Sequence, residues 1–133
     1  MKLNEIEGIG PAYAEKLGAH GLTSVDDLLE HGGTAAGRQT LAEKSGISET
    51  LLLEWVNHAD LFRINGVGSE YADLLEEAGV DSVPELAQRN AANLAAAMAQ
   101  VNESKNLVRR APTESEVAGW IDHAKTLPRA VHH

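Results

Sequence analysis

Short apolar segments alternate with glycine, proline and helix-capping residues along this chain, a pattern that predicts a series of helices. Pro11 lies just inside a helix that we expect to end within residues 18–21. Ser24 and Ser82 are expected to cap the helices that follow, because a serine hydroxyl can accept a hydrogen bond from a free backbone N–H. Glu85, three residues after Ser82, predicts a capping box there.

Two further helices each carry one of the tryptophans, Trp55 and Trp120. Ser48 and Thr113 precede them and are expected to be their N-caps. Gly46 is expected to end the helix before the first of them. Each half of the chain is therefore predicted to contain a hairpin, a short helix, a longer helix and a Trp-bearing helix.

The two halves are similar in sequence. Residues 6–29 align with residues 64–87 without a gap, at an offset of 58, and ten of the 24 positions are identical. Residues 55–59 match residues 120–124 at an offset of 65, so the second copy has seven extra residues in its middle. Self-similarity over this length indicates a tandem duplication.

The first repeat is assigned to residues 1–61 and the second to residues 62–130, with residues 131–133 as a tail. No linker rich in Gly, Ser or Pro separates the repeats, and residues 54–63 are helical in pattern. We expect one compact all-α body with approximate internal two-fold symmetry.

The composition supports this class and excludes several kinds of chemistry. Only 4% of the residues are aromatic, 43% are hydrophobic, and there is no cysteine. Such a composition is typical of close-packed helices, and it excludes disulfides, thiolate catalysis and Cys-based metal sites. No metal or cofactor is expected. The longest apolar run, residues 94–99, is too short for a membrane span, and the N-terminus lacks a signal-peptide pattern, so a cytoplasmic location is expected.

Each repeat begins with a turn of the form Gly-hydrophobic-Gly, which is followed by an alanine and further apolar residues. The turns are Gly8-Ile9-Gly10 and Gly66-Val67-Gly68. Glycine permits the positive φ of a tight turn between helices, and the hydrophobic residue between the glycines fills the gap between those helices. Ala14 and Ala72 allow the helices to approach closely.

These turns and their flanks resemble the helix-hairpin-helix motif. The resemblance implies that backbone N–H groups of the turn and of the next helix hold a nucleic-acid phosphate, sometimes with a monovalent cation on turn carbonyls. Over nearly its full length, the chain resembles an uncharacterised bacterial family of tandem helix-hairpin-helix proteins, known only as a domain of unknown function. That family has been likened to the helix-three-turn-helix element of flap endonucleases.

The charge restricts what the hairpins can do. The formal net charge is −9, with four Lys and Arg against ten Asp and Glu up to residue 62, and seven against ten after it. DNA-binding hairpins of this kind place Lys or Arg two residues after the second glycine, where this chain has Ala12 and Glu70. We therefore expect any nucleic-acid contact in the second repeat, and the first turn to be structural. The predicted site is Gly66, Val67 and Gly68 with Arg63, Arg89, Arg109 and Arg110.

Trp55 and Trp120 each precede a histidine by three residues, His58 and His123, on one helical face. These residues could form a metal pair or a stacking platform for bases. The pattern favours a structural role, in which the tryptophans are core residues and each histidine bonds a neighbouring helix end.

Tyr13 and Tyr71 occupy equivalent positions in the two hairpin helices. Each could present its hydroxyl to a phosphate, but packing against the helix of Val25 or Val83 is favoured. Acidic runs such as residues 76–77 are interpreted as solvated helix ends.

No nucleophile with a base, phosphate-binding loop, dinucleotide fingerprint or scaffold for a carboxylate metal cluster is visible in the sequence, so no enzymatic activity is expected. Two hypotheses remain open. The chain is a non-catalytic module that weakly binds the DNA or RNA backbone through its second hairpin, or it is a protein-interaction module, such as a homodimer, with structural hairpins and an acidic surface. Neither a membrane nor a small-molecule substrate is indicated.

Overall fold

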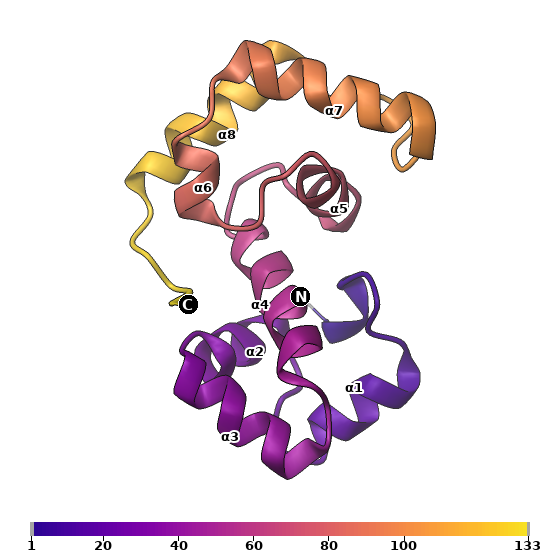
Figure 1. Ribbon diagram of the computed structural model, residues 1–133, viewed down its shortest axis with the longest axis vertical. Coiled ribbons are helices and arrows are strands. Elements are labelled where there is room, and N and C mark those ends of the chain that lie inside the picture. Colours follow the sequence, from indigo (N-terminus) through magenta and orange to yellow (C-terminus); the bar gives the residue numbers. More distant parts are fainter. Residues whose placement is uncertain (1, 133) are drawn as a thin grey trace. The chain divides into compact units, whose positions relative to one another are not determined.

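The computed structural model describes residues 2–132, which are predominantly helical (Figure 1). Residues 1 and 133, the latter in the predicted tail, lie outside the described part. The elements are a 3-10 helix at Leu3–Glu5 and eight α-helices, α1 Pro11–Gly18, α2 Val25–Gly32, α3 Ala35–Ser45, α4 Glu49–Leu61, α5 Ser69–Glu77, α6 Val83–Ala87, α7 Ala91–Lys105 and α8 Glu114–Thr126. The predicted all-α class is confirmed.

The chain divides into two compact units. The first comprises residues 2–60 together with residues 130–132, and the second comprises residues 61–129. The boundary predicted from the sequence, at residue 61, lies next to this division. The predicted two-fold relation between the repeats stays a prediction.

The C-terminal segment belongs to the first unit through hydrogen bonds to the end of α2. The N–H of His132 donates to the carbonyl of Gly33 at 2.7 Å. The buried guanidinium of Arg38, on α3, donates to the carbonyls of His132 at 2.7 Å and Gly32 at 2.8 Å. This attachment joins residues 94 positions apart, which no local sequence pattern indicates.

Local capping groups fix several helix ends, as predicted. The Ser24 hydroxyl accepts from the Asp27 N–H at 3.1 Å, and the Asp27 carboxylate accepts from the Ser24 N–H at 3.2 Å. Thr113 and Glu116 exchange the same pair of bonds, both at 3.1 Å, at the start of α8. Gly46 ends α3 with a φ of 77°.

The capping box predicted at Ser82 is wrong. Ser82 is the N-cap residue of α6, but its side chain makes no capping hydrogen bond and is largely buried. The Glu85 carboxylate instead accepts from the N–H of Asp81 at 3.2 Å, one residue earlier than a capping box requires. The spacing of Ser82 and Glu85 fits a capping box. The burial of Ser82, however, depends on tertiary packing, which the spacing does not indicate.

Both tryptophans lie in the cores of their units. Trp55 on α4 is 1% exposed and Trp120 on α8 is 6% exposed, which confirms the core interpretation. Their burial excludes the alternative in which they stack on bases. Around Trp120, the second core contains the fully buried side chains of Leu74, Leu75, Leu86, Leu94 and Met98.

None of the helices in the described part of the chain combines the length and the apolar character that a bilayer crossing requires.

Candidate nucleic-acid interface

The turn before α5 has the backbone geometry that its glycines predict. Gly66 has a φ of 90°, and a Cβ at this position would lie 3.2 Å from Nε1 of Trp120. Val67 is buried, and its N–H donates to the carbonyl of Ile64 at 3.1 Å. The N–H of Asn65 donates to Nδ1 of His123 at 3.1 Å. The turn is therefore tight, and it packs against Trp120 and His123 of α8.

The N-terminus of α5 has no side-chain cap. Gly68 is the N-cap residue, and the first helical bond runs from the Ala72 N–H to the Gly68 carbonyl at 2.9 Å. The N–H groups of residues 69–71 therefore have no acceptor within the helix. This end differs from those of α2 and α8, where capping side chains accept such groups. A phosphate oxygen could accept hydrogen bonds from the N–H groups at α5.

Tyr71, in the first turn of α5, connects the hairpin to the loop before α8. Its ring lies 5.2 Å from that of Trp120, and its hydroxyl donates to the carbonyl of Arg110 at 3.2 Å. In the first unit, Tyr13 lies 5.0 Å from Trp55. The aromatic partner of each tyrosine is thus the tryptophan, which the prediction of packing against the Val83 or Val25 helix missed.

Arg110 is close to the hairpin, but its charge is compensated. Its guanidinium donates to both carboxylate oxygens of Glu116, at 2.7 and 3.2 Å. This hydrogen bonding lowers the pKa of Glu116 from 4.5 to about 2 and raises the pKa of Arg110. One face of α8 carries Glu116, Trp120 and His123, because these residues are spaced four and three positions apart. This face holds both Arg110 and the turn.

Arg109 is exposed, and the Tyr71–Arg110 hydrogen bond holds the next residue in the chain against α5. Arg63 precedes the turn and donates to the carbonyl of Pro128 at 2.6 Å. Both arginines therefore lie in segments directly connected to the hairpin. Glu70, an exposed acid in the first turn of α5, opposes any phosphate there.

Arg89 lies at the other end of α5. Its guanidinium donates to the carbonyl of Gly79 at 3.4 Å, and Gly79 follows the C-terminus of the helix. Nine helical residues separate this end from the turn by about 13 Å. Lys105 pairs with Glu77 at the same end. The structure thus does not bring Arg89 together with Gly66–Gly68, although the sequence grouped them.

The first hairpin has a similar turn but fewer donors. Gly8 has a φ of 93°, a Cβ there would lie 3.3 Å from Nε1 of Trp55, and Ile9 is buried. Gly10 is the N-cap residue of α1, again without a side-chain cap, but Pro11 occupies the first helical position and has no N–H.

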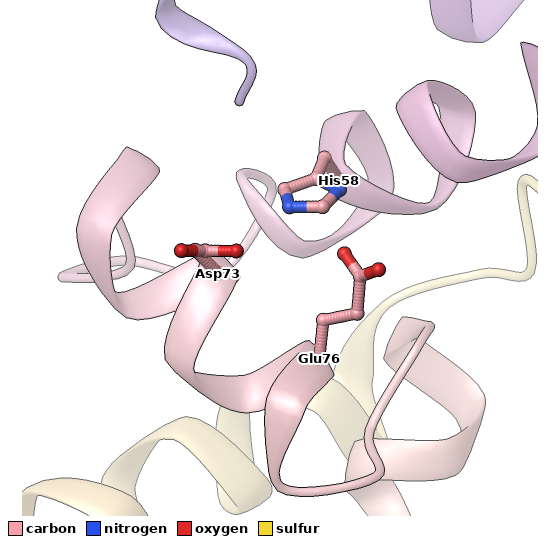
Figure 2. A group of neighbouring side chains, drawn as sticks. All are labelled: His58, Asp73 and Glu76. Carbon is pink, nitrogen blue, oxygen red and sulfur yellow. The ribbon is translucent and has the colours of Figure 1, made fainter. Parts of the chain in front are cut away.

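No motif in the sequence marks two acidic residues on α5, Asp73 and Glu76, as a site. Figure 2 shows the side chains of Asp73 and Glu76 projecting from the same side of this helix. Glu76 is half-buried and its Oε2 is shielded from solvent, so the interpretation of this residue as a solvated helix end is wrong. His58, drawn in the same figure, belongs to α4 of the first unit, where its Nδ1 lies 3.0 Å from the carbonyl oxygen of Glu54. That carbonyl lies one turn earlier in the same helix.

The family model described as Domain of unknown function (DUF4332) matches residues 7–127 of this chain. The chain belongs to the DUF4332 family. No curated protein and no solved structure shows significant similarity to it. Membership of DUF4332 does not assign an activity to the chain.

Proposed function

We propose that this DUF4332 protein is a non-catalytic helix-hairpin-helix module that binds the nucleic-acid backbone weakly and without sequence preference through its second hairpin. The observation that carries the proposal is the uncapped N-terminus of α5 after the tight Gly66-Val67-Gly68 turn, with the exposed Arg109 in the loop that Tyr71 of α5 bonds through the Arg110 carbonyl. The paired glycine geometry at Gly8 and Gly66 supports a helix-hairpin-helix assignment for both turns.

Phosphate binding at this end of α5 has a direct physical basis. The free N–H groups of residues 69–71 point along the helix axis, and the helix dipole adds partial positive charge at the same end. Arg109 supplies a full positive charge in the adjoining loop, and Arg63 lies just before the turn. None of these groups reads a base edge, so the binding would be independent of sequence.

Two acidic residues near this end of α5 limit the affinity for a phosphate. Glu70 repels a phosphate at the helix end, and Glu116 compensates Arg110. With one to three phosphate contacts, the slope of log affinity against log salt would be about −1 to −3 on duplex DNA. The first hairpin, with Pro11 and an acidic surrounding sequence, is proposed to be structural.

The test is fluorescence anisotropy of labelled duplex, single-stranded and branched DNA at about 20 and 150 mM salt, a range over which phosphate contacts weaken strongly. Arg109→Ala is expected to weaken binding and to reduce the salt slope by about 0.9, the value for one phosphate. Gly68→Glu is expected to weaken binding further, and Glu70→Lys to strengthen it. Arg89→Ala is the matched control, because it removes the same charge from the far end of α5.

Two results would reject the proposal at different levels. If no form of DNA binds at low salt, the nucleic-acid function is wrong. If Arg109→Ala and Arg89→Ala weaken binding equally, the charge of the unit matters but the hairpin site does not. Circular dichroism of each variant checks that its fold is intact.

The acidic first repeat favours a second candidate, a protein-interaction module. The net charge of −9, with ten acidic against four basic residues up to residue 62, would suit a basic partner surface. This candidate predicts no DNA binding at low salt, and it predicts salt-sensitive association with a basic protein surface or, for a homodimer, a concentration-dependent mass in light scattering.

A further inference from the structure

A cavity of about 350 Å³ lies in the first unit. Its lining comes from the segment after α1, from the end of α2 and from α3. The α3 residues Ala36, Thr40 and Lys44 are spaced by four, so they share one face of that helix. The cavity is thus a local feature of three consecutive elements.

The lining includes buried apolar side chains. Leu22 is 1% exposed and Leu41 is 6% exposed, and both line the cavity with Ala36. Gly37 keeps α3 close to the end of α2, because a Cβ at this position would lie 2.2 Å from the carbonyl oxygen of His31. Because the two leucines expose little surface, a compact hydrocarbon group in the cavity would contact mainly the exposed Ala36 and the edge of Leu41.

The ionisable side chains of the lining are basic rather than acidic. His20, His31 and Lys44 line the cavity and are exposed, and none of its described lining residues is acidic. The Thr40 hydroxyl already donates to the carbonyl of Ala36 at 3.1 Å, so the remaining side-chain donors are those of the histidines and the lysine.

We propose that this cavity binds a small organic carboxylate, with its hydrocarbon part against Ala36 and the exposed edge of Leu41 and its carboxylate at Lys44. The volume is near the lower end of the range for ligand sites, which suits a ligand about the size of benzoate. The net charge of −9 does not prevent such binding, because charges beyond about 8 Å are largely screened at physiological salt. This site is independent of the proposed backbone binding.

The test uses the full chain labelled with ¹⁵N, titrated with benzoate at pH 7 and followed by two-dimensional NMR. Shifts are expected at the amides of residues 22, 36, 37, 40 and 41, and benzamide, a neutral molecule of similar shape, is expected to bind more weakly. Lys44→Gln should weaken benzoate binding about two- to fivefold, the range for an exposed ion pair. Lys16→Gln is the matched control, because it removes the same charge from an exposed position of the first unit outside the cavity.

A cavity-filling variant, Ala36→Phe, is expected to abolish the shifts while the helical circular dichroism remains. The proposal is overturned if benzoate shifts none of these amides, or if benzamide binds as tightly as benzoate. It is also overturned if Lys44→Gln and Lys16→Gln have the same effect. If inorganic phosphate produces the same shifts at the same concentration, the apolar half of the proposal is wrong.

Discussion

Gly66→Ala tests whether the hairpin turn depends on glycine for the physical reasons that the structure indicates. Gly66 has a φ of 90°, a region that residues with a Cβ rarely adopt, and the strain is about 1–3 kcal/mol. The added Cβ would also lie 3.2 Å from Nε1 of Trp120, so the indole would have to move. Overpacking of this kind adds about 1 kcal/mol or more. We expect the free energy of unfolding to fall by about 3 kcal/mol.

Gly68→Ala is the matched control within the same turn. Gly68 has a φ of −97°, which any residue can adopt, and a Cβ added there would point into open space, with no packed group within 4 Å. Alanine is a poorer N-cap than glycine, but it also restricts the unfolded chain, so the net change should be below about 1 kcal/mol.

The assay is urea unfolding followed by tryptophan fluorescence in a Trp55→Phe background, which leaves Trp120 as the single tryptophan. For a slope of about 2 kcal/mol/M, a loss of 3 kcal/mol moves the midpoint by about 1.5 M. Gly8→Ala, read through Trp55 in a Trp120→Phe background, should behave similarly, because its φ is 93° and its Cβ would lie 3.3 Å from that indole. If Gly66→Ala and Gly68→Ala lower stability equally, the reasoning about the turn is wrong.

Two further predictions concern ionic and polar contacts. Glu116 has a pKa of about 2 because Arg110 donates to it, so it stabilises the fold fully above its usual pKa of 4.5 and loses this effect as the pH falls towards 2. Glu116→Gln should therefore melt below the parent chain at pH 7, and the gap between the two melting temperatures should narrow as the pH falls from 4.5 through about 2; a gap that does not change with pH would contradict this assignment. Arg38→Met removes the bonds to the Gly32 and His132 carbonyls and should lower stability by about 1–3 kcal/mol in urea unfolding. Deletion of residues 130–133 also removes the buried side chain of Val131 and the His132–Gly33 bond, but it should cost less in the Arg38→Met variant than in the parent chain, because the Arg38–His132 bond is already absent there. A fully additive loss would show that Arg38 does not act through the C-terminal segment.

Much of the helical framework could be predicted because its signals are local. The N-cap hydroxyls of Ser24 and Thr113 accept from N–H groups three residues away, and the positive φ of Gly66 follows from a tight turn that only glycine accepts without strain. Ser82 shows the limit of this reasoning, because its spacing to Glu85 fitted a capping box while burial and a different acceptor geometry decided the outcome.

The candidate site likewise has some features that follow from local sequence and others that follow from tertiary packing. The Gly66-Val67-Gly68 turn and the sign of the nearby charges could be predicted, because both depend on residue type and on neighbours along the chain. Which arginines accompany that turn became clear from the folded arrangement alone. Arg89 bonds a carbonyl at the far end of α5, Arg110 is compensated by Glu116, and the loop carrying Arg109 is held beside α5. These outcomes depend on packing between segments tens of residues apart, for which position along the chain is no guide.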